Sequence, residues 1–443
     1  MSNLKYWQPM THPAATIANP PIEIVAASGV SVTDSDQHTT LDAVGGLWNV
    51  NLGYSSQAIK SAMADQLEAL PYYSSFTGVA TDRARELAHR LVDWFAPQGM
   101  ARVFYTSGGS DSIETALRLA RQIHKLKGDK DRTKFISLKK GYHGTHFGGA
   151  SINGNAKFRR NYEPLLSGCY HITAPWVYRN PFNETDPARL AQLCAAQLED
   201  EIKFQGPDTV AAFIMEPVLG AGGVIVPDKT FMPMVREICD RYGVLLIADE
   251  VITAFGRTGA WTGSALWGVK PDLMCTAKAI TNGYFPFGAT LIAEHLVALF
   301  ESNHQDPAGD IGHGYTYSGH PVGAAAGIAM LDELAKVDVA TNSAQRGEQL
   351  QRGLHKLAER YDVIGDVRGV GLMAAIELVS DRETKKPMDK KTLATLFSAT
   401  YKAGVMVRIS GNVVILSPPL IITDKDVDLI IDALDVGLRA ISE

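Results

Sequence analysis

The chain alternates short apolar runs with longer amphipathic stretches. Six runs rich in β-branched or aromatic residues predict strands, at Arg102–Tyr105, Lys134–Leu138, Val210–Met215, Val244–Ala248, Asp272–Thr276 and Gly288–Ile292. Between them, apolar residues at helical spacing predict helices, among them Asp111–Leu126, Pro187–Lys203 and Met232–Tyr242. Strands this short and apolar are expected in a parallel sheet with helices on both faces.

The two ends of the chain follow a different pattern. Residues 1–54 mix short strand and turn signals, and two long helical stretches follow Pro321. Beyond these, the pattern predicts strands at Val363–Val367, Leu372–Val379, Val405–Arg408 and Val413–Leu416, and helices at Lys391–Ala403 and Asp424–Ile441. We therefore predict a large α/β domain over residues 55–320, and a smaller α+β domain in which residues 1–54 pack with residues 321–443.

The bulk composition narrows the class of protein. A chain of 443 residues is too long for one small core, and 46% hydrophobic with 20% charged residues is ordinary for a globular protein. The net charge of −6 lacks the basic surplus of a nucleic-acid-binding protein. Four scattered cysteines suggest neither a zinc site nor a disulfide framework, which fits a reducing cytoplasm: Cys169, Cys194, Cys239 and Cys275.

Neither of two candidate segments resembles a membrane or export signal. Residues 1–7 lack the long apolar core of a signal peptide. The apolar segment from Val322 to Leu331 is too short to span a bilayer and runs into Asp332 and Glu333, so a buried helix is expected. We predict a cytoplasmic enzyme with no membrane or nucleic-acid partner.

A glycine-rich turn lies between a predicted strand and a predicted helix. In Tyr105–Asp111, Gly108 and Gly109 allow close backbone approach, Ser110 supplies a hydroxyl, and the helix N-terminus presents free N–H groups. These features suit a phosphate, although a plain turn capped by Ser110 or Asp111 explains the segment equally well. The spacing matches neither the dinucleotide nor the nucleoside-triphosphate motif.

Two apolar strands end in ionisable side chains. Asp249 follows one strand, where an acid faces the ligand crevice of an open α/β sheet and could keep a ring nitrogen protonated. Lys278 follows another, where a lysine is costly unless it is paired, reaches solvent or reacts with an aldehyde as a Schiff base. Taken singly, Asp249 is better explained as a turn cap and Lys278 as a solvent-reaching lysine.

An aromatic residue completes a set of cofactor-binding features. Tyr142 follows the strand near Leu138, where its ring could stack on a flat cofactor. His143 and His146 form an HxxH pair without a third ligand at useful spacing, so no metal site is predicted. A phosphate seat, an aromatic plate, a ring-nitrogen acid and a Schiff-base lysine together favour pyridoxal 5′-phosphate (PLP).

The ordered motifs resemble those of class III aminotransferases, specifically the ω-transaminase (amine–pyruvate) branch. The resemblance extends from Trp48 to Pro419, in the blocks LDAVGGLWNVNLGY, FYTSGGSDS, GYHG, MEPVLGAGGVIVP, LLIADEVITAFGRTG, PDLMCTAKAITNGYFPFGA, HGYTYSGHP, DVRGVGLM and VRISGNVVILSPPL. It implies fold-type I: a mainly parallel seven-stranded sheet between helices, plus a smaller domain from both chain ends. Many relatives have Ser-Gly-Ser-Glu where this chain has Gly108–Asp111, so one phosphate-binding hydroxyl is missing here.

The resemblance also implies roles around the cofactor. Lys278 would hold PLP and move the substrate proton, and Asp249 would face the ring nitrogen. Val251 and Tyr142 would cover the two ring faces. Thr316 would complete the phosphate site from the neighbouring subunit, in a homodimer or tetramer. The other expected cofactor contacts are Gly108, Gly109, Ser110, His143, Glu216 and Tyr315.

Substrate roles follow from the same resemblance. Trp48 and Tyr142 would form aromatic walls of a two-pocket amine site, with Phe76 supplied across the dimer. Ala221 and Ile252 would line the smaller spaces. Arg408 resembles the mobile arginine that binds a keto-acid carboxylate, a group that suits a bidentate guanidinium. Glu216 is expected to pair with Arg408 when the amine is bound.

The expected reaction is a ping-pong transfer from an amine to a keto acid, with pyruvate as the expected acceptor. The sequence leaves arylalkyl amines, β-alanine, diamines and other ω-amino acids open as donors, and the family favours S-amines. An aminomutase, decarboxylase or racemase of the same family is the nearest alternative. A non-catalytic binding protein is the other, and it predicts loss of Lys278, Asp249 or the phosphate seat.

Overall fold

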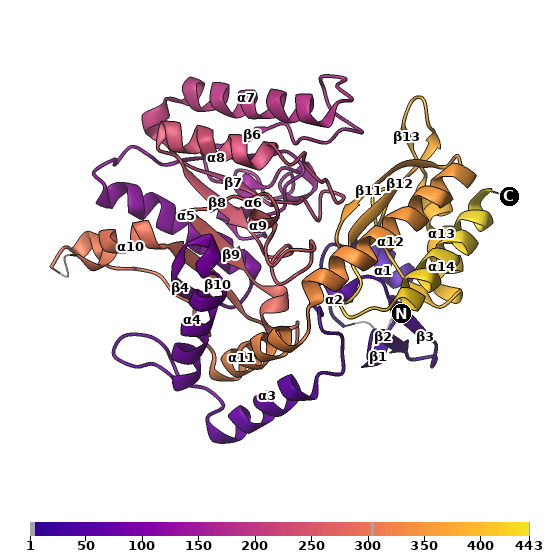
Figure 1. The fold of residues 1–443 in the computed structure, drawn as a ribbon, viewed down its shortest axis with the longest axis horizontal. Coiled ribbons are helices and arrows are strands. Elements are labelled where there is room, and N and C mark those ends of the chain that lie inside the picture. Colours follow the sequence, from indigo (N-terminus) through magenta and orange to yellow (C-terminus); the bar gives the residue numbers. More distant parts are fainter. Residues whose placement is uncertain (1–4, 303–304, 443) are drawn as a thin grey trace.

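The computed structural model describes residues 5–302 and 305–442, and its larger part is built around a seven-stranded sheet (Figure 1). Its order is β4-β10-β9-β8-β7-β5-β6, and only β10 runs antiparallel to its neighbours. The strands are β4 (Met100–Thr106), β5 (Lys134–Leu138), β6 (Cys169–Ile172), β7 (Val210–Met215), β8 (Leu245–Asp249), β9 (Leu273–Thr276) and β10 (Gly288–Ala293). The predicted mainly parallel, seven-stranded sheet is confirmed, and of its strands only β6 was not recognised from the pattern.

Helices cover both faces of this sheet because successive strand residues point to opposite sides. In β7, Phe213 and Met215 join the core formed with α7 (Pro187–Gln205) and α8 (Phe231–Tyr242). Ile214, between them, joins the core formed with α5 (Gly109–Leu126) and α10 (Glu294–Glu301). The sheet is thus buried on both faces, as its continuous apolar strands predicted.

A second sheet belongs to the C-terminal part of the chain (Figure 1). Its order is β11-β12-β16-β15, and a short strand, β13, pairs with β12. The strands are β11 (Ile364–Val370), β12 (Met373–Asp381), β13 (Lys386–Pro387), β15 (Arg408–Ser410) and β16 (Val413–Leu416). Three helices pack with this sheet or with one another: α12 (Val339–Arg360), α13 (Lys390–Lys402) and α14 (Asp424–Ser442).

The two ends of the chain share a third, four-stranded sheet of order β1-β2-β3-β14. The strands are β1 (Ile24–Ser28), β2 (Ser31–Asp34), β3 (Thr39–Asp42) and β14 (Val405–Met406). The parallel pairing of Leu41 with Val405 joins residues far apart in the sequence, and Tyr401 donates a hydrogen bond to Asp34. The two ends therefore pack together as predicted. The exact boundaries at residues 54 and 320 stay a prediction.

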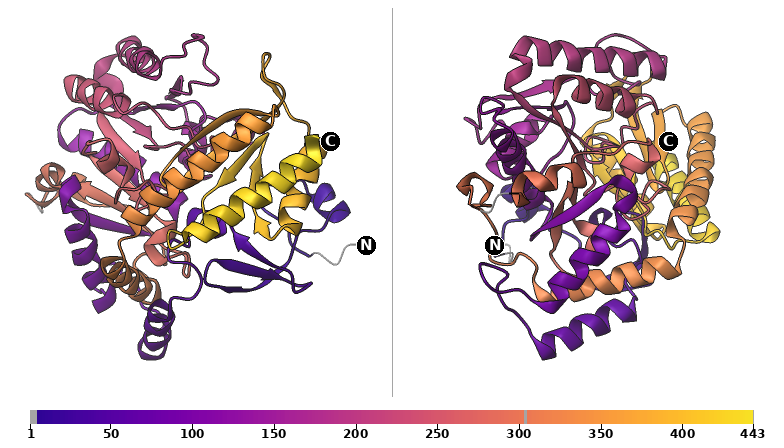
Figure 2. Two further views of the ribbon diagram at one scale, coloured as in Figure 1. Left: turned by 45° about the vertical axis from the view of Figure 1, so that its right-hand side comes forward. Right: turned by 60° about the vertical axis from the view of Figure 1, so that its left-hand side comes forward.

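The remaining helices connect these parts, and Figure 2 shows them from two further sides. They are α1 (Pro13–Ala18), α2 (Gly45–Trp48), α3 (Gln57–Ala69), α4 (Asp82–Trp94), α6 (Phe147–Ile152), α9 (Gly263–Leu266) and α11 (Pro321–Lys336). The segment Val322–Leu331 lies buried in α11, which packs against α3 and α4, so the predicted buried helix is confirmed. Within residues 5–302 and 305–442, no helix has the length and apolarity needed to cross a bilayer. Residues 1–4 of the N-terminal prediction lie outside the described residues.

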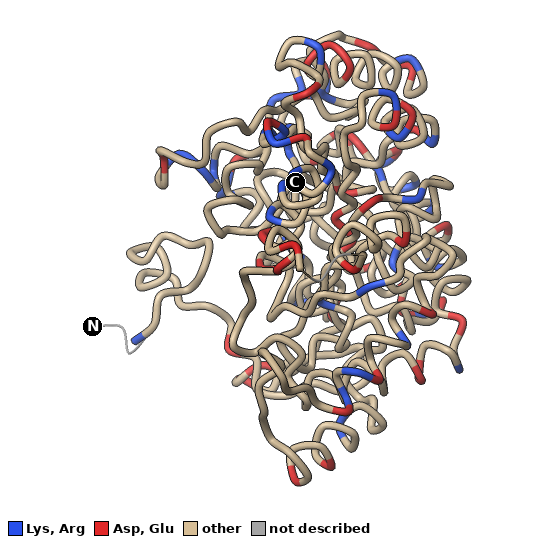
Figure 3. The backbone as a smooth tube through the Cα atoms, turned by 90° about the vertical axis from the view of Figure 1, so that its left-hand side faces the viewer, with Lys and Arg blue, Asp and Glu red and all other residues tan. Residues whose placement is uncertain are grey.

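A buried arginine joins three distant segments near the cavity described below. Figure 3 shows acidic and basic residues interspersed over the molecule, but Arg257 is fully buried. Its guanidinium donates to the carbonyl oxygens of Leu372 (3.1 Å) and Pro418 and to Asn51 Oδ1 (2.7 Å). Burial lowers the pKa of Arg257 to about 9. Because a buried cation without its acceptors is strongly destabilising, this contact fixes the N-terminal segment against both other parts.

Candidate active site

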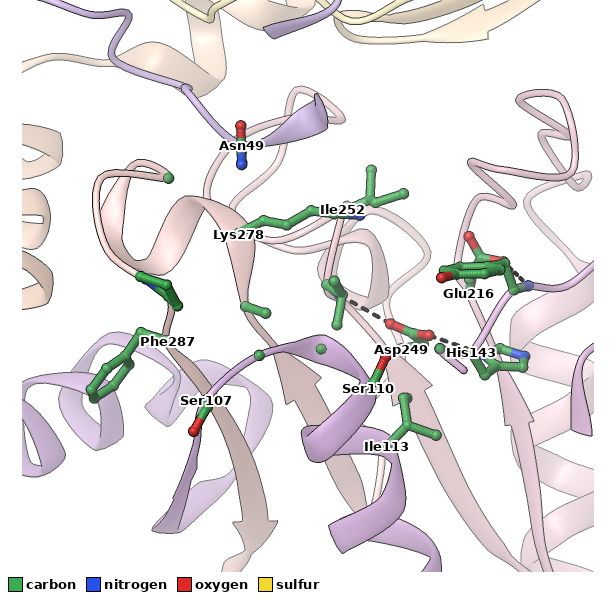
Figure 4. A pocket seen from close by; sticks show the side chains of 18 of the residues that line it. Asn49, Ser107, Ser110, Ile113, His143, Glu216, Asp249, Ile252, Lys278 and Phe287 are labelled. Carbon is green, nitrogen blue, oxygen red and sulfur yellow. Dashed lines mark hydrogen bonds and ion pairs between the residues drawn. The ribbon is translucent and has the colours of Figure 1, made fainter. Parts of the chain in front are cut away.

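One cavity lies at the carboxyl ends of the parallel strands, where ligands bind in open α/β sheets (Figure 4). It measures about 960 Å³ when its open mouth is included. Its walls come from the segments that follow β4, β5, β7, β8 and β9 and from Asn49 near the N-terminus. Lys278, Asp249, Tyr142 and the Gly108–Ser110 turn, which the sequence analysis singled out separately, all line this one cavity.

Asp249 lies at the end of β8 with only 5% of its surface exposed. Its Oδ2 lies 2.9 Å from Nδ1 of His143, and its Oδ1 accepts the Val251 N–H at 3.2 Å. His143 is itself held by its backbone N–H, which donates to Asn153 Oδ1. The imidazole, which also lines the cavity, therefore fixes the orientation of the carboxylate.

Glu216 is a buried acid that connects two loops of the cavity wall. Its Oε1 accepts the N–H of Tyr142 and its Oε2 accepts the N–H of Gly220, both at 2.8 Å. Burial and the nearby charge of Asp249 raise the pKa of Glu216 to about 7. Glu216 thus holds Tyr142 and the loop that carries Ala221 in fixed positions.

Lys278 is the first residue of a short 3₁₀ turn, Lys278–Thr281, directly after β9. Its φ of +50° lies in the left-handed region, which is uncommon for a side chain of this size and often marks a functional position. Burial lowers the pKa of the Lys278 amine to about 8, although the charges of Asp249 and Glu216 oppose this shift. At neutral pH, a larger fraction of this amine is therefore unprotonated and nucleophilic than of an ordinary lysine.

This shift predicts selective labelling of Lys278 in the cofactor-free protein. A neutral amine is the reactive form, so reductive methylation with formaldehyde and cyanoborohydride should rise through pH 8 and level off above it. Ordinary surface lysines reach the same reactivity only near their usual pKa of about 10.4. Peptide mass spectrometry across pH 6–11 would measure both sets of lysines. A Lys278 profile that follows the surface lysines would contradict the lowered pKa.

The turn before α5 has the features expected of an anion seat. A Cβ on Gly109 would lie 3.0 Å from Val251 Cγ1, so glycine permits the close packing of this turn on Val251. Asp111 turns away from the cavity: it accepts the Ser107 N–H at 3.0 Å and bonds to His146 Nε2 at 2.6 Å. Among the residues that the structure describes, Ser110 Oγ accepts a single long bond, from Thr145 N at 3.3 Å, and Ser110 lines the cavity at the helix N-terminus.

The two histidines of the HxxH pair contact different carboxylates. His143 bonds to Asp249 and His146 to Asp111. In the part of the chain that the structure describes, no group of three or more His, Cys, Asp or Glu residues could hold a metal ion. Both imidazoles therefore act as partners of acidic side chains in this structure.

The structure separates the predicted substrate residues into two groups. Ile252 lines the cavity, and Ala221 lies in the loop held by Glu216. Trp48, only 1% exposed, packs behind Ile252 in a small apolar cluster and does not line the cavity of a single chain. Phe76 is exposed and lies near Gly314, away from the described cavity. The substrate-binding roles of Trp48 and Phe76 stay predictions.

Tyr315 and Thr316 also lie outside the cavity of a single chain. The Tyr315 hydroxyl donates to the carbonyl oxygen of Asp111 at 3.0 Å, close to the start of α5. Thr316 is exposed, and its carbonyl oxygen accepts a hydrogen bond from Tyr72 at 2.8 Å. Their cofactor contacts stay predictions, and so does the contribution of Thr316 to the site of a neighbouring subunit.

Arg408 is a partly buried cation in β15 near the cavity. Burial lowers the pKa of its guanidinium, and its charge acts on both Tyr142 and Lys278. Among residues 5–302 and 305–442, no side chain forms an ion pair or hydrogen bond with this guanidinium. Glu216 instead accepts two backbone N–H groups, so its pairing with Arg408 in an amine-bound state stays a prediction.

The cavity also includes residues that the sequence analysis did not single out. Asn49, Phe285 and Phe287 are among its lining residues. All three lie inside the motif blocks LDAVGGLWNVNLGY and PDLMCTAKAITNGYFPFGA. Their place in these blocks is the sequence feature that could have marked them as site residues. Their side-chain types carry no chemistry that could be recognised from spacing alone.

Comparison with known proteins identifies the family. Residues 14–438 match the family described as Aminotransferase class-III. The chain belongs to the class III aminotransferases. It is 37% identical to the putrescine–pyruvate aminotransferase of Pseudomonas aeruginosa over 410 residues, which cover 92% of this chain and 88% of that protein.

Solved structures of two transaminases share the fold. A PLP-bound amine transaminase from an uncultivated Pseudomonas species is 47% identical, covers 99% of both chains and superposes with a TM-score of 0.97. An (S)-enantioselective ω-transaminase from Thermomicrobium roseum is 35% identical, with a TM-score of 0.94 over 98% of this chain and 96% of that one. The predicted fold-type I architecture, ω-transaminase resemblance and PLP-dependent aminotransferase class are thus confirmed.

Proposed function

We propose that this class III aminotransferase moves an amino group from an amine or ω-amino acid to pyruvate. The observation that carries the proposal is the convergence of Lys278, Asp249 and the start of α5 on one cavity beside the unpaired Arg408. The relative from P. aeruginosa is named for putrescine and pyruvate, and the structure with 47% identity is of an amine transaminase. Both names support an amine donor, and the first also supports a pyruvate acceptor.

The residues of the cavity fit PLP. Gly108, Gly109 and Ser110 would hold its phosphate at the helix N-terminus, where the absence of a side chain at Gly109 lets this turn pack closely on Val251. Tyr142 and Val251 would cover the ring, and the Lys278 amine would bind the aldehyde carbon. When bound there, PLP supplies an electron sink for the substrate carbon.

The chain's own side chains supply the proton chemistry in this proposal. Asp249, oriented by His143, would keep the ring nitrogen protonated because its carboxylate places a negative charge beside that nitrogen. Lys278, with a pKa near 8, would take a proton from the substrate carbon and return one as general base and acid. Glu216 would act by positioning Tyr142.

Arg408 would bind the carboxylate of the keto acid. A partly buried guanidinium without a protein partner favours a bidentate anionic ligand, because the two hydrogen bonds to that ligand offset the hydration that the guanidinium loses on burial. An apolar amine donor has no carboxylate for this contact, so its binding would not depend on Arg408. The two half-reactions should therefore respond differently when this side chain is changed.

Replacing Arg408 with methionine is expected to raise the KM for pyruvate by about 10- to 100-fold, the value of a charged hydrogen bond at a desolvated site. The KM for an apolar amine such as 1-phenylethylamine should change by less than about threefold, since that half-reaction needs no carboxylate contact. Initial rates over a grid of both substrates measure the two constants. Arg189→Met, on the exposed face of α7, is the matched control. An unchanged KM for pyruvate would remove Arg408 from acceptor binding.

A second copy of the chain would complete the site. Phe76, Tyr317 and the hydrophobic side chains of Tyr72 and Tyr73 are exposed near Thr316, which suits a surface buried between subunits. We propose a homodimer in which Phe76 and Thr316 reach the partner's cavity. A cytoplasmic location fits the four cysteines, which are free and form no disulfide in the described residues.

The experiment that tests the function is alanine formation from pyruvate with a panel of donors. The panel contains putrescine, β-alanine, 4-aminobutyrate and both enantiomers of 1-phenylethylamine. If no donor of the panel yields alanine, the amine–pyruvate proposal is wrong. Carbon dioxide release, or isomerisation without any keto acid, would point to a decarboxylase or mutase reaction instead.

A further inference from the structure

We infer that Asn49 determines substrate preference by donating a hydrogen bond to a neutral oxygen near the reacting carbon of the substrate. The chemical class is an amine or ketone that carries an ether, hydroxyl or carbonyl oxygen on the carbon adjacent to the reacting carbon. This inference rests on the proposed function, because it concerns the same cavity.

Asn49 reaches the cavity from the N-terminal segment rather than from the seven-stranded sheet. It is partly buried and lines the cavity together with Lys278, Ile252 and Gly283. Figure 4 shows its side chain across the Lys278 side chain from Asp249 and His143, with the amide nitrogen on the Lys278 side. The amide therefore faces the space that a substrate bound near Lys278 would occupy.

The orientation of the amide follows from its neighbours. The Leu47 N–H lies 3.3 Å from Asn49 Oδ1, and an N–H can only be accepted by the oxygen of an amide. The Nδ2 group has no hydrogen-bond partner among the residues that the structure describes. Both of its N–H donors are thus free for a ligand.

Two glycines provide the room for this side chain. A Cβ on Gly46 would lie 2.6 Å from Asn49 Oδ1, and a Cβ on Gly283 would lie 2.8 Å from Cγ and 2.9 Å from Nδ2. Both glycines have positive φ, +67° and +72°, which other residues rarely adopt. The backbone on both sides is therefore shaped around one position of the Asn49 amide, as expected for a preorganised donor.

The surroundings favour a neutral oxygen as the ligand group. Ile252 contributes apolar surface to this part of the cavity, so an unpaired amide donor gains most from a single acceptor placed within its reach. A carboxylate would be drawn to the unpaired guanidinium of Arg408 instead. An uncharged oxygen on the substrate chain satisfies Asn49 without competing for Arg408.

Two amines of equal size test the inference with pyruvate as acceptor: 1-methoxy-2-aminopropane, which carries an ether oxygen, and 2-aminopentane, which has a methylene group there. The measured quantity is the ratio of their kcat/KM values. Asn49→Leu is expected to lower this ratio about three- to tenfold relative to the unchanged protein, the value of one hydrogen bond. Asn49→Asp keeps the shape of the side chain but removes the N–H donor, so it should lower the ratio at least as far. This variant replaces Asn49→Leu in the test if the leucine variant does not fold.

Controls separate this role from others at the same place. Leu47→Ala, at a neighbouring exposed side chain, should leave the ratio unchanged. Titration of cofactor-free protein with PLP, followed by absorbance, should give the same affinity for Asn49→Leu and the unchanged protein. Weaker PLP binding would assign Asn49 to the cofactor, and an unchanged ratio would show no contact with the substrate oxygen; either result overturns the inference. Turnover of neither amine, while a donor of the panel above is used, would also overturn the inference, whereas failure with every donor would contradict the proposed function itself.

Discussion

Replacing Lys278 with alanine is expected to lower kcat for transamination by about 10³-fold or more. The methyl group can neither bind the cofactor aldehyde nor move the substrate proton, and positioned general acid–base catalysis alone contributes about 10²- to 10⁴-fold. Alanine at a φ of +50° has the same Cβ strain as lysine, and it removes an amine whose burial is unfavourable, so it should not disturb the fold. Alanine formation from pyruvate and a good donor measures the loss.

Two further measurements separate chemistry from folding in this variant. The melting temperature should stay close to that of the unchanged protein, and Lys270→Ala, at an exposed lysine, should retain full activity. The PLP-loaded protein should lose its visible absorbance on borohydride treatment and gain the mass of the reduced cofactor at Lys278, whereas the alanine variant should gain none. Turnover retained by the variant would remove Lys278 from the reaction.

Replacing Asp249 with asparagine is expected to lower kcat by about 10²- to 10³-fold, the effect typical of losing one preorganised electrostatic partner. The amide keeps the size of the side chain and can still bond to His143, but it carries no charge to keep a ring nitrogen protonated. The cofactor would still bind through the phosphate seat and Lys278, but it would accept electrons less well. Single-turnover rates of the amine half-reaction, followed by absorbance, measure this effect without the acceptor step.

The control for Asp249→Asn is Asp208→Asn, an exposed carboxylate before β7 that should have no effect. A PLP analogue that carries a permanent positive charge on the ring nitrogen, such as the N-methyl compound, should restore part of the lost rate in the variant. Equal rates for the variant and the unchanged protein would show that Asp249 does not act on the ring.

The sequence predicted the large sheet well because its central strands are continuously apolar. β7 and β8 are buried along their whole length, so their apolar runs stand out against the helices between them. β6 was missed because Cys169–Ile172 is short, partly exposed and includes a histidine, and only its pairing with β5 makes it a strand. The pairing of Leu41 with Val405 was expected only in general terms, since strand partners distant in sequence leave no local pattern.

The candidate site was predictable where chemistry and strand ends coincide. Asp249 and Lys278 could be found because an ionisable residue directly after a buried strand needs an explanation. The bond between His143 and Asp249 and the two contacts of Glu216 could not, because they depend on how neighbouring loops fold over the sheet. Asn49 lies more than 200 residues from Lys278 in the sequence, and only the folded chain brings the two together.

The pairing of β3 with β14 has a consequence for synthesis on the ribosome. Asn49 and Trp48 follow β3 closely, but the strand that anchors β3 at its edge, and the carbonyl of Pro418 that binds Arg257, are made more than 350 residues later. At about 5–20 residues per second, the N-terminal segment waits tens of seconds for these partners. During that time its apolar residues have no permanent place to pack. Nascent chains should therefore recruit chaperones through this segment, and the cavity wall that contains Asn49 should be among the last parts to form.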